Sequence, residues 1–137
     1  MFPNASNNPC AVAPEISWDA VDLTVLAGYE AVQLAGEPDL VVELIDLYVE
    51  DARRRLATLR DSLTARDWPA LKREIHSLKG SSASLGALQV ARVCEEMEAI
   101  ELGLLRLRLP VLLSWLELEL DRAIHIFFAV RQTRIMI

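Results

Sequence analysis

Apolar residues recur every three or four positions through most of this chain, and that spacing is typical of amphipathic helices. One long run spans residues 38–65, where charged residues fill many of the positions between the apolar ones. Its inward-facing members are Val41, Ile45, Tyr48, Ala52, Leu56, Leu59 and Leu63. A later run has Leu109, Leu112, Leu113, Leu116, Leu120, Ile124 and Phe127 on one side. The 137 residues suffice for one hydrophobic core, so these apolar faces are expected to pack against one another.

Capping and turn residues predict where the first three helices begin and end. Ser17 is expected to cap a short leading helix, with an acidic residue in the first turn. Pro38 suits the start of the second helix, because proline is tolerated in a first turn. Asp67 is expected to cap the third helix, and Gly86 to turn or break it.

The last part of the chain predicts two more helices. Val90, Cys94 and Met97 give a fourth helix that is expected to fade near Gly103, and a fifth is expected to begin at Pro110. Short connections between successive amphipathic helices favour antiparallel neighbours. The predicted fold is therefore all-α: an antiparallel, up-and-down four-helix bundle with a short additional N-terminal helix.

The composition divides the chain into one folded domain and two ends. Residues 1–15 hold three prolines among Asn, Ser and Ala, and are expected to form a flexible N-terminal tail. Residues 16–130 are expected to form the helical domain, and residues 131–137 a C-terminal extension. The initiating Met favours a free-standing protein, with a fragment of a longer chain as the alternative.

The charge and the cysteines limit the classes of function. A net charge of −6 opposes non-specific binding to nucleic acid or to an anionic membrane. Cys10 and Cys94 belong to no ligand cluster, so no metal site is expected, and both are interpreted as reduced thiols. No apolar stretch is long enough to span a membrane, and the N-terminus lacks the features of a secretion signal. These features together favour a cytoplasmic protein.

The segment 75–87, IHSLKGSSASLGA, departs from the usual composition of a helix. His76 lies about 100° around the helix from Ile75, so its imidazole is expected to face solvent. The residues expected on the same exposed face, within two turns of the histidine, are Lys72, Arg73, Lys79, Gly80 and Ala83. An acidic protein thus places a small basic patch around one histidine.

Three chemical consequences follow for His76. A neutral imidazole offers a nucleophilic nitrogen near pH 7, and neighbouring cations disfavour its protonated form. The same cations would attract a phosphoryl group carried on the ring. Gly80 costs a helix about 1 kcal/mol relative to alanine, yet leaves room for a bulky partner one turn beyond the histidine. Ala83 continues that low surface, so a functional histidine is favoured over a merely solvated one.

The sequence resembles the histidine-containing phosphotransfer (HPt) domain family of two-component phosphorelays. HSLKGSSASLGA in residues 76–87 is similar to the HxLKGxS segment of that family, with its following LGA. DWPALKREI before it resembles the usual lead-in, and residues 38–59 resemble the preceding helix of the family. The resemblance covers roughly residues 16–103. Two departures are Ile75, where the family usually has Ala, and Tyr48, where Phe is common.

The resemblance implies that His76 accepts the phosphoryl group, that Lys79 helps to neutralise it, and that Gly80 leaves room for the incoming domain. Lys72 and Arg73 are expected to support docking or the local electrostatics. The implied partners are receiver domains of response regulators and a histidine or hybrid kinase. No cofactor is expected on this chain, since the Mg²⁺ of such transfers belongs to the receiver.

The resemblance implies a phosphorelay carrier without autonomous catalytic activity. The alternative is a helical adaptor that binds receiver or kinase domains without being phosphorylated. An autonomous enzyme is disfavoured, because the sequence has no nucleotide-binding glycine loop, metal cluster or catalytic triad. Docking is expected to use the face around His76 and the exposed side of the helix over 38–65. Donor, acceptor, direction of phosphoryl flow, signal and output are left open.

The last helix carries a second apolar row beside its main inward stripe, formed by Val111, Trp115 and Leu118. One hypothesis is that this row covers the short first helix. The other is that it forms a dimer interface or a second docking surface. A monomer is expected, with a dimer through the C-terminal helix as the alternative.

Overall fold

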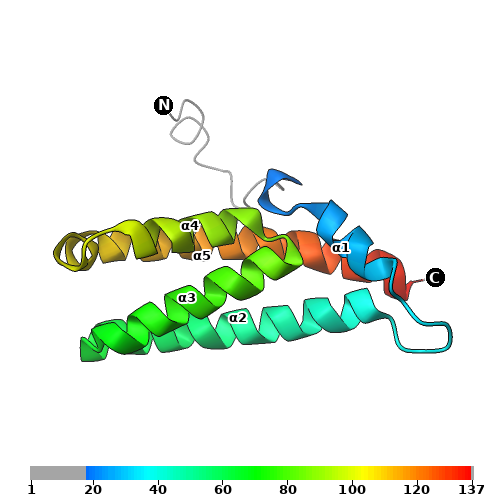
Figure 1. Cartoon of the computed structure of the whole chain (residues 1–137), viewed down its shortest axis with the longest axis horizontal. Helices are drawn as coiled ribbons and strands as arrows, with labels where there is room; N and C mark the ends of the chain where they lie inside the picture. The colour runs from blue at the N-terminus through cyan, green and yellow to red at the C-terminus, as the bar shows by residue number, and fades with distance from the viewer. Residues whose placement is uncertain (1–17, 137) are drawn as a thin grey trace, which may run out of the picture.

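The computed structural model describes residues 18–136, and every regular element in that range is helical. A 3₁₀ turn, η1 (Trp18–Ala20), precedes the short helix α1 (Leu23–Glu30). Four longer helices follow: α2 (Leu40–Ala65), α3 (Trp68–Leu85), α4 (Leu88–Ala99) and α5 (Leu102–Ile135). Figure 1 shows these four helices running along one another, with α1 at one end.

The four long helices form an antiparallel bundle. α3 packs on α2 and α4, and α5 packs on the same two helices. α3 and α5 therefore occupy opposite corners of the bundle. Connections of two residues between successive helices force each to run back along the one before. The predicted four-helix bundle with a short additional N-terminal helix is confirmed.

The core is an apolar interior to which every helix contributes. Ile75, directly before the histidine in sequence, is 1% exposed and packs inward. The Tyr48 ring meets the Phe127 ring edge to face, with centroids 5.4 Å apart. The Tyr48 hydroxyl forms a buried 2.8 Å hydrogen bond with the Ser82 hydroxyl, and burial raises the pKa of the phenol. Tyr48 therefore packs as phenylalanine would and also binds α3 to α2.

The first two helices begin later than the sequence predicted. α1 starts after Asp22, whose carboxylate accepts a 3.0 Å hydrogen bond from the Thr24 backbone N–H. Ser17, the predicted cap, lies outside the described residues. α2 is capped by Asp39 and not opened by Pro38, because the Asp39 carboxylate accepts from two first-turn N–H groups.

The predicted boundaries of α3 are confirmed. Asp67 accepts a 3.1 Å hydrogen bond from the Ala70 backbone N–H at the N-terminus. Gly86 ends the helix with a φ of 85°, in the left-handed region that glycine adopts easily. These two residues fix the ends of the helix that carries His76.

The prediction for the start of α5 was wrong. The helix does not begin at Pro110 but at Leu102, and it runs through Pro110 without ending. Proline lacks the N–H that would bond one turn back, which disfavours an interior position by about 3 kcal/mol. Buried leucines on both sides of the proline (Leu105, Leu109, Leu112 and Leu116) hold the helix to the core across it.

The two ends of the chain differ in what the structure describes. The expected tail, residues 1–15, lies outside the described residues. The expected division between 16–130 and 131–137 falls inside α5. Beyond it, Arg131 pairs with Asp46 at 2.7 Å and Arg134 with Asp39 at 2.8 Å, so both arginines tie the end of α5 to α2.

Replacing Gly86 with alanine is expected to destabilise the bundle by more than about 2 kcal/mol. A Cβ at this position would lie 2.6 Å from the backbone oxygen of Asp22, and the residue also needs its φ of +85°. Gly36→Ala is the matched control, since Gly36 has a φ of +83° and nothing within 4 Å of the added Cβ. That variant should lose only about 1 kcal/mol. Urea unfolding of both variants measures the difference, and equal losses would contradict the steric argument.

Candidate functional site

His76 stands on the outer surface of α3. Leu71, Ile75 and Leu78 are buried on one side of this helix, which turns the intervening His76 away from the core. The imidazole is 71% exposed. The expectation of a solvent-facing histidine is therefore confirmed, and a partner can approach the ring without any rearrangement of the bundle.

A glutamate from the next helix holds the histidine ring. The Nδ1 atom of His76 lies 3.0 Å from Oε2 of Glu98 on α4. An ionised carboxylate can only accept hydrogen bonds, so Nδ1 is the nitrogen that carries the proton in the neutral ring. The lone pair of that ring is then on Nε2. The contact with Glu98 thus selects the nitrogen that can act as a nucleophile.

Lys79 shares the same carboxylate. Its Nζ lies 2.7 Å from Oε1 of Glu98, so the two carboxylate oxygens bind the lysine and the histidine separately. The hydrogen bond from Lys79 has the largest effect in lowering the pKa of Glu98, and the bond from His76 lowers it further. The contact between Lys79 and Glu98 also raises the pKa of Lys79. Glu98 therefore stays ionised and Lys79 stays charged beside the ring.

The remaining predicted site residues surround His76 on the exposed face of α3. Lys72 and Arg73 lie one turn before it, and neither forms an ion pair with another described residue. Gly80 and Ala83 are exposed one and two turns after it. A Cβ added at Gly80 would meet nothing within 4 Å. The histidine thus has cations on one side along the helix and a low surface on the other.

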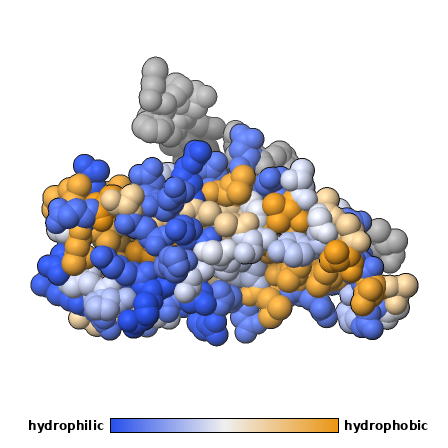
Figure 2. Space-filling model, viewed as in Figure 1, coloured by the Kyte–Doolittle hydropathy of each residue, from blue (hydrophilic) through white to orange (hydrophobic). Residues whose placement is uncertain are grey.

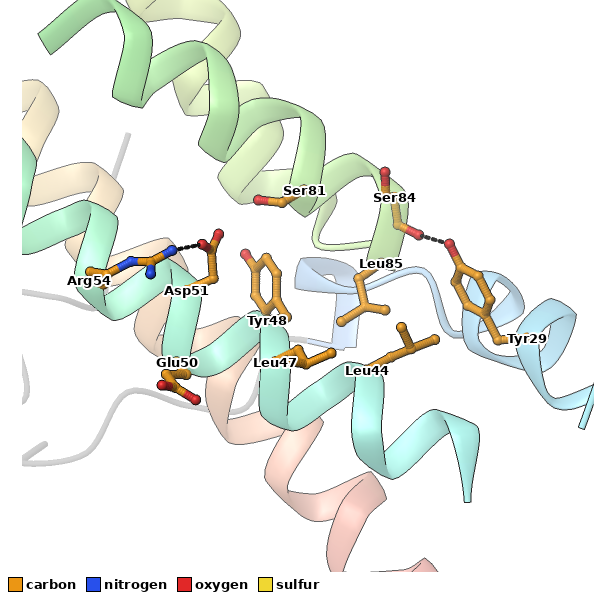
Figure 3. Close-up of a pocket in the computed structure, with 10 residues that line it drawn as sticks. All are labelled: Tyr29, Leu44, Leu47, Tyr48, Glu50, Asp51, Arg54, Ser81, Ser84 and Leu85. Atoms are coloured by element: carbon orange, nitrogen blue, oxygen red, sulfur yellow. Dashed lines mark hydrogen bonds and ion pairs between the residues drawn. The ribbon is translucent and has the colours of Figure 1, made fainter. Parts of the chain in front are cut away.

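An apolar groove lies beyond this low surface, where α1 and α2 meet the end of α3. It encloses about 440 Å³ and is lined by Tyr29, Leu44, Leu47, Tyr48, Glu50, Asp51, Arg54, Ser81, Ser84 and Leu85. Figure 3 shows Leu44, Leu47 and Leu85 converging in its middle, with the Arg54–Asp51 ion pair at one end. At the other end, the Tyr29 hydroxyl donates a 2.8 Å hydrogen bond to the Ser84 carbonyl. Figure 2 shows hydrophobic surface gathered over this part of the molecule.

Glu98 is the site residue that the sequence analysis missed. The signal was the inward stripe of the fourth helix: Glu98 follows the buried Cys94 by one turn, at the edge of the stripe that meets α3. Cys94 itself is buried, and burial raises the pKa of its thiol to about 12, so it is an unreactive core residue. His125 is exposed on α5, and its Nδ1 donates to the Asp121 carbonyl at 2.8 Å.

The fold and the site together define a class: a small helical bundle that presents a histidine on an open helix face. The sequence matches the Hpt domain family over residues 43–125. The chain therefore belongs to the family of histidine phosphotransfer domains, whose members are carriers that work with kinases and receiver domains in two-component systems. No group of three or more His, Cys, Asp or Glu among residues 18–136 is arranged to hold a metal ion.

Characterised relatives agree with this assignment. Histidine-containing phosphotransfer protein 5 of Arabidopsis thaliana is 39% identical over 62 residues, which are 43% of this chain and 40% of the relative. Histidine-containing phosphotransfer protein 2 of the same plant is 34% identical over 62 residues and is likewise matched over 40% of its length. The chain thus spans about two fifths of the plant proteins that it matches.

A solved structure extends the likeness to the whole bundle. Histidine-containing phosphotransfer protein B (HptB) from Pseudomonas aeruginosa PAO1 superposes with a TM-score of 0.72 and is 32% identical. The match covers 85% of this chain and 98% of HptB. The shared fold therefore extends over nearly the full length of HptB.

Proposed function

We propose that this chain is a phosphorelay carrier whose His76 accepts a phosphoryl group from a receiver-domain aspartate or a histidine kinase and passes it to another receiver. The observation that carries the proposal is the His76–Glu98 contact, which leaves Nε2 of an exposed ring as the nucleophile. Membership of the Hpt family supports the same reaction.

In the transfer, the Nε2 lone pair forms a bond to phosphorus while the bond from phosphorus to the aspartate oxygen breaks. The aspartate leaves as a carboxylate, and the Nδ1 proton remains on the ring, held by Glu98. Lys79 supplies a positive charge beside the transferred group. No cofactor is needed on this chain, and the Mg²⁺ of the reaction would be bound by the receiver.

The receiver is proposed to dock on the exposed face of α3 around His76 and on the exposed side of α2. The groove between α1, α2 and α3 offers apolar surface for such a contact. Gly80 and Ala83 let the receiver approach the histidine closely, because neither projects far from the helix. Lys72 and Arg73 would attract the acidic, phosphorylated site of the receiver.

The chain is proposed to act without autonomous catalytic activity, since the activated phosphoryl group comes from the partner. Its proposed partners are proteins and not nucleic acid or lipid, consistent with a net charge of −6. Among the described residues, no helix is both long and apolar enough to cross a membrane. We propose a cytoplasmic location, where kinases and receivers exchange phosphoryl groups.

A transfer assay tests the proposed function. The purified chain is mixed with a panel of phosphorylated receiver domains, and label on the chain is tested for loss in acid and persistence in base, the pattern of phosphohistidine. Acid-labile label supports the carrier. Binding to receivers without any label would favour the adaptor instead.

Replacing Glu98 with glutamine is expected to shift the transfer equilibrium away from the phosphorylated chain by roughly tenfold. The change removes the carboxylate that holds the Nδ1 proton, so the positive charge that the ring gains when Nε2 bonds to phosphorus loses its partner. Equilibrium labelling with a fixed receiver measures the shift. Glu96→Gln is the control, because Glu96 is exposed on the same helix and forms no hydrogen bond or ion pair with His76 or Lys79.

The same variant has a defined effect on stability. Because the pKa of Glu98 is lowered in the folded chain, its contacts stabilise the fold above the ordinary pKa of a glutamate and are lost as the pH falls through the lowered value. Glu98→Gln should therefore be less stable than the wild type at pH 7, by no more than about 1 kcal/mol, and should converge with it in acid. A difference in stability that grows on acidification would contradict the assigned contacts.

A further inference from the structure

A row of apolar side chains stays exposed along the first half of α5. The row is formed by Leu104 (38% exposed), Leu107 (78%), Val111 (74%), Trp115 (36%) and Leu118 (41%), and is called here the α5 row. The hypothesis that it covers the short first helix was wrong: α1 packs on α2 and α3, and the row stays exposed even though the 3₁₀ turn η1 before α1 contacts α5. Two of its five members, Leu104 and Leu107, were not predicted, because this helix was expected to begin only at Pro110.

The α5 row is symmetric about Val111. Leu107 and Trp115 are each four residues from Val111, and Leu104 and Leu118 are each seven residues from it. At 100° per residue, all five side chains lie within about 40° of Val111 around the helix. An antiparallel copy of the same helix would thus place Val111 on Val111, Leu107 on Trp115 and Leu104 on Leu118. Every member of the row meets another apolar member.

The residues beside the row are complementary in the same register. Arg108 lies beside the row, on the same side of the helix as Trp115. The antiparallel arrangement therefore brings its guanidinium over the partner's Trp115, and a cation is attracted to the face of an indole ring. Glu101 and Arg122 lie near opposite ends of the row, so the antiparallel arrangement brings Glu101 of each chain beside Arg122 of the other. Arg122 already donates to Glu119 through Nη1, and its side chain is still 32% exposed.

The position of the α5 row leaves the phosphotransfer site open. α5 and α3 occupy opposite corners of the bundle, each packed on α2 and α4. The inward leucines of α5 point toward the bundle centre, and the α5 row is on the other side of the same helix. A second copy bound there would not cover His76 of either chain.

We propose that a second copy of this chain binds the α5 row, in a two-fold symmetric, antiparallel dimer with Val111 on the axis. Such an interface is self-complementary, as a two-fold dimer requires. A row of this length runs about 21 Å along the helix, which makes a small interface compared with the ~800 Å² per partner of a stable complex. The dimer is therefore weak and depends on concentration in the micromolar range or above. It presents two His76 sites on one particle.

Sedimentation equilibrium from roughly 10 µM to 1 mM tests the dimer. The wild type should move from the mass of one chain toward that of two. Val111→Glu should weaken the association by more than about tenfold, because it places two carboxylates on the axis. Leu34→Glu is the matched control, since Leu34 is 68% exposed in the connection between α1 and α2, outside the row. A wild type that stays monomeric throughout, or equal effects of the two variants, would overturn the proposal.

Disulfide cross-linking tests the register separately. In a Cys10→Ser background, where the remaining Cys94 is buried, Val111→Cys should form a cross-linked dimer on mild oxidation. Leu104→Cys alone should not, because its two copies would lie about 21 Å apart. Mixed with Leu118→Cys, it should cross-link. Equal cross-linking of Val111→Cys and Leu104→Cys alone would indicate random collision and overturn the two-fold register.

Discussion

Replacing His76 with glutamine is expected to abolish phosphoryl transfer to this chain while leaving its fold intact. The glutamine amide has no nucleophilic nitrogen lone pair, so no bond to phosphorus can form. The side chain is 71% exposed, and exposed substitutions usually change the free energy of unfolding by less than about 0.5 kcal/mol. Transfer should therefore fall to background at nearly unchanged stability.

The chain supplies its own matched control for this variant, because it contains two histidines. His125→Gln changes the other one, which is exposed near the far end of α5 and hydrogen-bonded to a backbone carbonyl. That variant should accept label at the wild-type rate. The measurement compares acid-labile label and urea unfolding for both variants and the wild type. Label that persists in His76→Gln would place the phosphoryl group on another residue.

The helix faces were predictable because burial is periodic. The inward residues of α2 and α3 follow the i+3 and i+4 spacing that the sequence displays, and Asp67 and Gly86 mark the ends of α3 chemically. The start of α5 was not predictable from Pro110, because the local cost of proline is offset by tertiary packing that no local sequence pattern reveals. Leu105 and Leu109 are fully buried before the proline, and their contacts keep the helix intact.

The part of the site that lies within one helical segment was predictable, and the part contributed by another helix was not. His76, Lys79 and Gly80 belong to one continuous segment, so their relation follows from helix geometry alone. Glu98 is 22 residues from His76 and approaches it only when α4 folds back on α3. In the sequence, Glu98 is one of several glutamates on the solvent-exposed side of a helix. It can be distinguished from Glu95 or Glu96 only once the rotation of α4 about its axis is known.

Replacing Gly80 with glutamine is expected to reduce transfer from receivers by about a hundredfold or more, because a displacement of the reacting groups by about 1 Å can cost that much. Gly80 lies one turn from His76, on the surface that separates the histidine from the groove between α1, α2 and α3. A long side chain there would hold the receiver away from Nε2. The substitution is neutral, so it leaves the electrostatics of Lys79 and Glu98 unchanged.

The fold should tolerate this change and even gain from it. A Cβ at Gly80 meets nothing within 4 Å, and glutamine favours a helix over glycine by roughly 0.5–1 kcal/mol. Gly28→Gln is the matched control, because Gly28 is also an exposed helical glycine with nothing within 4 Å of an added Cβ. Single-turnover transfer and urea unfolding should show slow transfer with increased stability for Gly80→Gln, and increased stability alone for Gly28→Gln. Undiminished transfer in Gly80→Gln would mean that the receiver does not approach His76 across this part of α3.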